Sequence, residues 1–345
     1  MRQIAPQIPR RTLIALAALL ALAGLAAVGL RPALPANASP LTTPIPSPTP
    51  NARPDGTLES TRLLLDTGTT AYYAITYWSD GLRVTGYLGR PAGSGPFPAV
   101  IYNRGGFQAT GELIGAEIVP LVEAGFVAAA SQYRGNAGGD GVEDFGGNDV
   151  HDVTNLLRAV QALPYVDADR IGMMGGSRGG MMTYLALKQD TLDGTHAIKA
   201  AVTVGGLADL FAWARQQGYV VGQVYVPLVG VSPYTDPAPF EARSAVYWPE
   251  LIDAPLLLLH GEADTTISVQ QSRTLAEALT EVGKTVEMVT FPGGDHPLTR
   301  FHSGYPEALD WFAQYLGTPG VDYSFAAHEQ AIANIATWFV VRAQG

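Results

Sequence analysis

The chain has 345 residues, a formal net charge of −10 and no cysteine, and 47% of its residues are hydrophobic. This length and apolar content suffice to bury one large core or two modest ones. The acidic charge, with no cluster of lysine and arginine, argues against a nucleic-acid partner, and the lack of cysteine excludes disulfides and thiol chemistry. The histidines are scattered along the chain, so we expect neither a metal site nor another cofactor.

The N-terminal residues have the pattern of an export signal. Arg2, Arg10 and Arg11 precede the uncharged run 12–30, and a small-x-small sequence, Ala-Asn-Ala, ends at position 38. We predict a cleaved signal peptide over residues 1–38, or alternatively an uncleaved membrane anchor passing through 12–30. Either alternative places the folded protein outside the cytoplasm, secreted or membrane-anchored.

A linker and a folded domain follow this N-terminal segment. Residues 39–57 are rich in proline, serine and threonine, a composition that forms neither a helix nor a core strand. We interpret them as a semi-extended tether. The folded domain is therefore expected to occupy residues 58–345.

Within this domain, strand-like and helix-like patterns alternate. Residues 70–78 and 82–88, joined by the turn 79–81, predict an antiparallel hairpin. Further strands are expected at short apolar runs, namely 99–102, 126–130, 171–174, 200–204, 256–260 and 286–291. Apolar residues at helical spacing predict helices over 153–163, 275–282 and 326–342. The alternation predicts an α/β fold, with a mostly parallel, doubly wound sheet, an antiparallel N-terminal edge hairpin and helices on both faces.

Two long stretches do not follow the alternation. Residues 207–250 are rich in aromatic side chains, which is typical of a cap-like insertion that forms one wall of a pocket. The same aromatic residues would equally serve to pack the insertion onto the body of the domain, and the sequence leaves both interpretations open. Residues 297–323 follow the last predicted strand and are placed to lie near a site there, but no residue in them is assigned a role.

The most informative motif is Gly175-Gly176-Ser177-Arg178-Gly179, which separates the strand-like run 171–174 from a helix-like run. A G-x-S-x-G sequence in this context is the nucleophile elbow of α/β-hydrolases. The small residues there permit a strained turn that exposes the serine hydroxyl. We therefore expect the α/β-hydrolase fold, with Ser177 as the nucleophile.

The other two members of a catalytic triad occur in the order this fold uses. Asp264 follows the strand-like run 256–260, and His296 follows the run 286–291. Reactive groups in such sheets lie beyond the carboxyl ends of the strands, so these side chains should meet Ser177. His296 would act as general base and then acid, and Asp264 would orient the imidazole.

Alternatives remain for two of these residues. Asp264 could be only a turn or helix-cap residue, since aspartate is favoured at such positions. His302 could replace His296 as the base. His260 lies inside an apolar strand and is expected to be a hydrogen-bonded core residue.

Beyond these single motifs, the chain from about Thr76 onward resembles the catalytic domain of the prolyl oligopeptidase family of serine peptidases. The segments that carry the resemblance are 78–88, 104–107, 132–139, 165–172, 176–183, 243–247 and 260–264. Several separate motifs in the same order make the resemblance specific. It implies the same triad, Ser177, Asp264 and His296.

The resemblance also implies an oxyanion hole, which needs hydrogen-bond donors aimed at the developing negative charge. One donor would be the backbone N–H of Arg178, and the second would come from the loop Tyr102-Asn103-Arg104-Gly105-Gly106. Arg104 occupies the place of that second donor, so its guanidinium is expected to contribute.

The family's peptidases carry an N-terminal β-propeller, and the residues that precede the predicted sheet here are too few to form one. The sequence therefore predicts a serine hydrolase of prolyl-oligopeptidase type that cleaves small peptides or esters through an acyl-enzyme. The alternative is a carboxylesterase resembling dienelactone hydrolases. A catalytically inert binding protein on the same fold is the third possibility.

Overall fold

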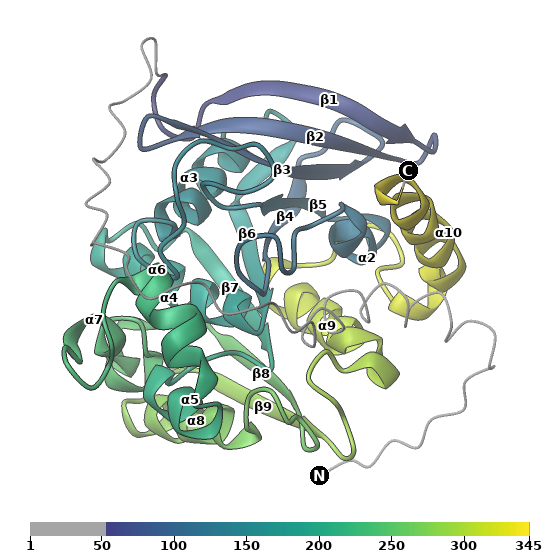
Figure 1. Ribbon diagram of the computed structural model, residues 1–345. Helices are drawn as coiled ribbons and strands as arrows, with labels where there is room; N and C mark the ends of the chain where they lie inside the picture. Colours follow the sequence, from purple (N-terminus) through teal and green to yellow (C-terminus); the bar gives the residue numbers. More distant parts are fainter. Residues whose placement is uncertain (1–52, 345) are drawn as a thin grey trace.

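A computed structural model describes residues 53–344 (Figure 1). The predicted signal or anchor over residues 1–38 and most of the predicted linker over 39–57 lie outside the described residues, so both stay predictions. Within residues 53–344, no helix combines the length and the apolar character needed to cross a membrane.

The centre of the molecule is a mixed β-sheet in the order β1-β2-β3-β5-β4-β6-β7-β8-β9. Strands β4 to β9 pair in parallel with one another, while β1, β2 and β3 add an antiparallel edge. The strands are β1 (Leu58–Asp66), β2 (Thr70–Ser79), β3 (Leu82–Pro91), β4 (Phe97–Asn103), β5 (Val127–Ser131), β6 (Val166–Gly176), β7 (Ile198–Val204), β8 (Leu256–Gly261) and β9 (Val286–Phe291).

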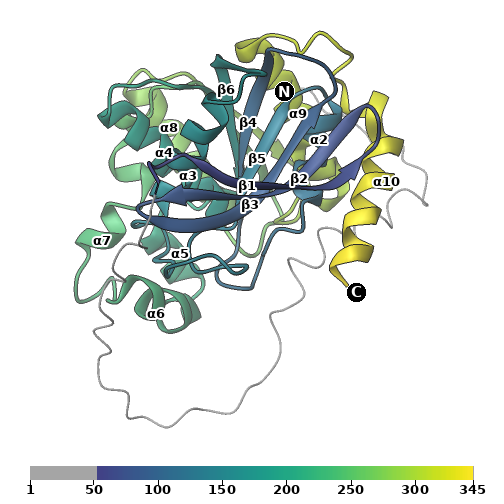
Figure 2. The ribbon, with the colours of Figure 1, turned by 90° about the horizontal axis from the view of Figure 1, so that it is seen from above.

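Helices cover both faces of this sheet, as Figures 1 and 2 show. One face carries α3 (Val150–Gln161), α4 (Arg178–Leu192) and α8 (Val269–Glu281). The opposite face carries the short turn η1 (Ala116–Ile118), α2 (Val119–Glu123), α9 (Tyr305–Leu316) and α10 (Phe325–Ala343). The predicted three-layer α/β arrangement is therefore confirmed.

Two hydrophobic clusters hold these layers together, one on each face of the sheet. Side chains alternate along a strand, so Met173 of β6 belongs to one cluster and its neighbour Met174 to the other. In β8 all four residues of the run Leu256–Leu259 are almost fully buried, because the sheet is covered on both faces. Strands that are covered on both faces consist of continuous apolar runs, and these runs allowed the strands to be predicted from the sequence.

The N-terminal edge differs from the expectation by one strand. The hairpin of β2 and β3 is confirmed, but β1 was not predicted. Most of its residues are exposed, because β1 pairs only with β2 at the edge of the sheet. Its apolar residues Leu63, Leu64 and Leu65 are consecutive instead of alternating, so they give no clear strand signal.

The insertion between β7 and β8 is helical and packs inward. Trp213, Tyr225 and Phe240 are buried in the cluster that covers the α3 and α4 face. Trp213 stacks on Phe145 with ring centroids 6.2 Å apart. These contacts favour the packing interpretation. The insertion contains α5 (Leu210–Gln216), η2 (Val221–Tyr225), α6 (Val226–Val229), α7 (Ala238–Glu241), η3 (Ala245–Tyr247) and η4 (Pro249–Leu251).

Candidate active site

Ser177 occupies a strained turn between β6 and α4. Its backbone angles are φ 57° and ψ −125°, a region that residues other than glycine seldom adopt. Its N–H donates to the carbonyl of Val204 at 2.9 Å, and its own carbonyl accepts from the N–H of Leu207 at 3.1 Å. Backbone strain of this kind costs about 1–3 kcal/mol and persists only where surrounding contacts enforce it.

The glycines of the motif are required by close packing. A Cβ on Gly179 would lie 2.0 Å from the carbonyl oxygen of Asn103 at the end of β4. A Cβ on Gly175 would lie 2.2 Å from the carbonyl oxygen of Gly179. The turn and the loop after β4 can therefore touch only because side chains are absent.

Asp264 and His296 meet beyond the ends of β8 and β9, as the sequence predicted. The Nδ1 atom of His296 lies 2.6 Å from Oδ2 of Asp264. The other carboxylate oxygen accepts the N–H groups of Thr266 at 2.8 Å and Ile267 at 2.9 Å. With its Nδ1–H directed to the carboxylate, the imidazole keeps Nε2 free to accept a proton.

A second histidine supports the carboxylate from inside the core. The Nε2 atom of His260 lies 3.2 Å from Oδ2 of Asp264 and 2.9 Å from the carbonyl oxygen of Ile267. Its Nδ1 pairs with the hydroxyl of Ser272 at 2.7 Å. His260 is fully buried, which fits the expected hydrogen-bonded core histidine. Burial favours a higher pKa for Asp264, but the hydrogen bonds from the two histidines lower that pKa well below its usual range.

Ser177 and His296 open onto one cavity of about 450 Å³. Gly105 and Gly106, from the loop after β4, line the same cavity. Three segments that are far apart in the sequence are thus brought to one edge of the sheet. His302 also lines this cavity, but the contact with Asp264 belongs to His296.

The side chain of Arg104 differs from its expected role. It is 1% exposed, and its nitrogen atoms donate to main-chain carbonyl oxygens of Gln132 at 3.0 Å, Thr110 at 3.2 Å and Gln108 at 3.1 Å. The guanidinium is thus directed to the main chain around it, and its charge lies 3.5 Å from the carboxylate of Glu143. The structure assigns Arg104 to holding the loop after β4, and the sequence could not show this because all three acceptors are main-chain atoms.

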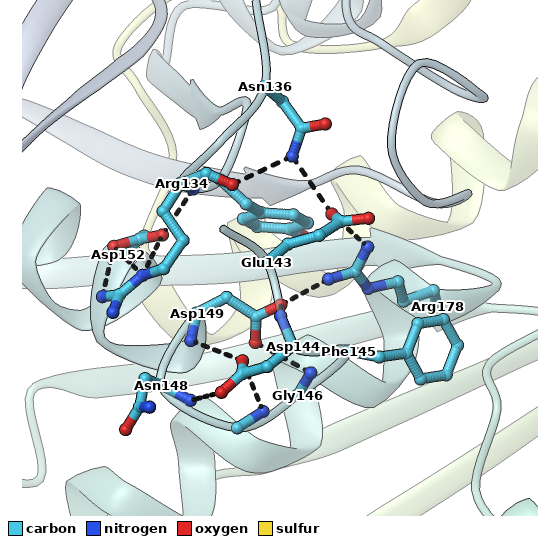
Figure 3. A network of polar contacts seen from close by, with 12 residues as sticks. Arg134, Asn136, Glu143, Asp144, Phe145, Gly146, Asn148, Asp149, Asp152 and Arg178 are labelled. Carbon is cyan, nitrogen blue, oxygen red and sulfur yellow. Dashed lines mark hydrogen bonds and ion pairs between the residues drawn. The ribbon is translucent and has the colours of Figure 1, made fainter. Parts of the chain in front are cut away.

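Arg178 is also buried, and its side chain is the centre of a polar network (Figure 3). Its guanidinium pairs with Glu143 at 2.8 Å and with Asp149. It also donates to the carbonyl of Gly106 at 3.1 Å. The residue that follows the nucleophile is therefore tied to the loop that faces it.

Glu143 connects this network to its surroundings. Its carboxylate accepts from Asn136 at 3.1 Å and from the N–H of Gln108, and it lies 3.5 Å from the guanidinium of Arg104. Burial alone would raise the pKa of Glu143, but the positive charge of Arg178 lowers it below its usual value. Glu143 is therefore ionised and shared between two buried arginines.

Backbone N–H groups remain as donors for an oxyanion. Arg178 is the first residue of α4, where an N–H has no acceptor within the helix. Among the residues the structure describes, the N–H groups of Gly105 and Gly106 have no acceptor either. A Cβ on Gly105 would lie 3.3 Å from Cβ of Ser177, so this loop passes directly beside the nucleophile.

The sequence analysis missed one wall of the cavity. Pro297, His302, Ser303 and Tyr305 line it, all from the stretch 297–323, in which only His302 had been considered, as an alternative base. His302 and Ser303 both adopt left-handed backbone conformations, with φ of 50° and 55°. Neither residue is a glycine or asparagine, and the one glycine of this left-handed turn, Gly304 with φ of 73°, comes after them. The sequence pointed to this stretch only through its closeness to His296.

Comparison with known proteins places this site in a family. A model of the prolyl oligopeptidase family matches residues 113–319, which is more than half of the chain. The chain belongs to the prolyl oligopeptidase family. It is therefore an enzyme of the serine-peptidase type, and the resemblance found in the sequence is confirmed.

Two curated members of this family come from Bacillus subtilis. The uncharacterized peptidase YtmA is 36% identical over 215 residues, which cover 62% of this chain and 82% of YtmA. The uncharacterized peptidase YuxL is 30% identical over 259 residues, which cover 69% of this chain but only 38% of YuxL. The chain thus spans most of one relative and less than half of the other.

Solved structures share the fold. A puromycin-hydrolyzing peptidase of Mycobacterium tuberculosis has a TM-score of 0.59 at 23% identity, covering 74% of this chain and 47% of that one. The acylaminoacyl peptidase of Pyrococcus horikoshii has a TM-score of 0.58 at 20% identity, covering 74% and 49%. The prolyl oligopeptidase family member described here therefore has the predicted α/β-hydrolase fold.

Proposed function

We propose that this enzyme cleaves peptide or ester bonds through an acyl-enzyme formed on Ser177. The proposal depends on one arrangement: the Asp264–His296 pair, joined at 2.6 Å, opens with the strained Ser177 onto a common cavity. A serine hydroxyl needs an adjacent base to become a nucleophile, and an imidazole oriented by a carboxylate provides it. His302 has no comparable carboxylate contact among the described residues.

In the first half of the reaction, Oγ of Ser177 attacks the carbonyl carbon of the substrate and its proton passes to Nε2 of His296. Asp264 accepts the Nδ1–H and stabilises the imidazolium. The oxyanion would be bound by the N–H of Arg178 and by an N–H of Gly105 or Gly106. His296 then gives the proton to the leaving amine or alcohol, and the bond to that group breaks.

In the second half, His296 removes a proton from water, and the hydroxide attacks the acyl carbon. The acid product leaves as the proton returns to Oγ of Ser177. The substrate, water, the three side chains and the backbone N–H groups account for every bond and proton in this sequence. Each preorganised N–H donor typically contributes on the order of 3 kcal/mol to such a reaction.

Family membership favours peptide substrates, and one observation favours esters as a second candidate. The cavity beside Ser177 is lined largely by apolar side chains, among them Met174, Ile332 and Val340. Such a surface offers few partners for the N–H and C=O groups of a peptide chain. A carboxylesterase acting on apolar esters is therefore the alternative.

Labelling with a fluorophosphonate probe tests the shared chemistry. The probe should label the wild-type enzyme, and Ser177→Ala should abolish labelling without unfolding the protein. Unlabelled wild-type enzyme would support an inert binding protein instead. Comparing hydrolysis rates for a short amino-acyl anilide and a short-chain nitrophenyl ester then distinguishes peptidase from esterase.

A further inference from the structure

The C-terminal helix α10 forms a wall of the cavity beside Ser177. Five of its residues line the cavity: Phe325, Ile332, Ala336, Val340 and Ala343. The family model ends at residue 319, so this helix lies beyond the part of the chain that the model matches. Figure 1 shows α10 next to α2, at the side of the sheet opposite to α3 and α4.

Resting on the proposed function, we infer that α10 makes this cavity a binding pocket for an uncharged apolar group attached next to the scissile bond. The wall that α10 contributes consists of aromatic and aliphatic side chains. Leu113, Ile114 and Met174 extend the apolar lining from the other side. About 300–1,000 Å³ is the usual size of a ligand site, and this cavity measures about 450 Å³.

The helix is fixed firmly enough to select substrates. Phe339 is 3% exposed and packs edge-on against Tyr72, with ring centroids 5.6 Å apart. Gly115 makes room for the same ring, since a Cβ there would lie 2.7 Å from it. At the start of the helix, the ring of Phe325 packs at a tilt against that of His302 with centroids 4.7 Å apart, which joins α10 to the segment that follows His296.

The charges around the pocket exclude an anionic group. Arg104 belongs to the cavity lining, but its guanidinium donates to main-chain carbonyl oxygens and lies 3.5 Å from Glu143, so its charge is already paired within the protein. Glu112 and Glu117 are in the lining as well, and a carboxylate in the ligand would be repelled by them. Burial raises the pKa of Glu117, so its repulsion of an anion is weaker than that of Glu112.

Two adjacent valines of α10 provide a matched test. Val340 lines the cavity, whereas Val341 is 65% exposed on the outer side of the helix. Val340→Trp should fill the pocket, while Val341→Trp adds the same indole outside it. Both variants are assayed beside the wild type on 4-nitrophenyl acetate and octanoate, and on ethyl and octyl acetate.

The expected result is a change in selectivity. In Val340→Trp, the ratio of kcat/KM for the long substrate to that for the short one should fall at least about tenfold, because each excluded methylene loses its burial. A fall in the octanoate series places the pocket on the acyl side, and a fall in the octyl series places it on the leaving-group side. Val341→Trp should keep the wild-type ratios.

Other outcomes overturn the inference. Wild-type ratios in Val340→Trp would show that the cavity does not hold the apolar group, even though turnover supports the proposed function. No Ser177-dependent turnover of any ester or anilide by the wild type would refute the proposed function itself. If Val340→Trp does not fold, Val340→Ala enlarges the same pocket and should raise the ratio for the long substrate; an unchanged ratio would count against the pocket.

Discussion

Replacing Glu143 by glutamine tests the network behind the nucleophile. Glu143 and Asp149 together balance the positive charges of Arg104 and Arg178, and all four side chains are at most 4% exposed. The amide is nearly isosteric, so packing is kept while one negative charge is lost. One buried cation then lacks its counter-charge.

The expected loss of stability follows from the burial of these four side chains. Removing one partner of a buried ion pair typically costs about 3–5 kcal/mol, because the remaining charge stays desolvated without compensation. We expect Glu143→Gln to lower the free energy of unfolding by about that amount, measured by urea denaturation with tryptophan fluorescence. Turnover of an ester should fall as well, since the same carboxylate holds the N–H of Gln108 in the loop beside Ser177.

An exposed ion pair in the same protein provides the control. Asp140 pairs with Arg83 at 2.9 Å, but the arginine side chain is 49% exposed. Asp140→Asn should therefore leave the urea midpoint close to that of the wild type. A loss below about 1 kcal/mol in Glu143→Gln, or equal losses in both variants, would refute the reasoning that burial makes this network essential.

Two further predictions concern Asp264. Asp264→Asn should lower kcat by about ten-thousand-fold with little change in KM, because the wrong imidazole tautomer of His296 is then favoured; steady-state kinetics would check this, and a loss under tenfold would remove Asp264 from the triad. The folded-state pKa values of Asp264 and Glu143 are lowered, so their contributions are complete above about pH 4 and are lost as the pH falls through the folded pKa values. Thermal unfolding between pH 7 and 2 should show the onset of this loss below about pH 4, with a shallower acid dependence in Asp264→Asn; identical profiles would contradict the assignment.

The residues of the site that could be predicted from the sequence are those marked by short local sequence patterns. The motif around Ser177 needs glycines within two residues of the serine, because the backbone of Asn103 approaches there. Asp264 and His296 were located by the apolar runs that precede them, since strands buried on both faces are easily recognised. Parallel strands bring such residues to one edge of the sheet without any further information.

The parts that the sequence did not predict depend on contacts between distant segments. The direction of the Arg104 side chain is set by main-chain carbonyls of Thr110 and Gln132, which carry no residue-specific signal. His302 lines the cavity from a left-handed turn in which two of the three residues, His302 and Ser303, are not glycines. Helix α10 was predicted almost to the residue, but its position over the cavity follows from packing against distant residues such as Tyr72 and His302.

The network around Arg178 has a consequence for how this enzyme can diversify. The loop and turn beside Ser177 are held by buried ion pairs that we also expect to stabilise the fold. A substitution in this network should therefore lower both activity and stability. The outer wall, made by α10 and the turn at His302, carries no such ions among the described residues. New substrate preferences are therefore most accessible through changes in that wall, with the reaction centre left intact.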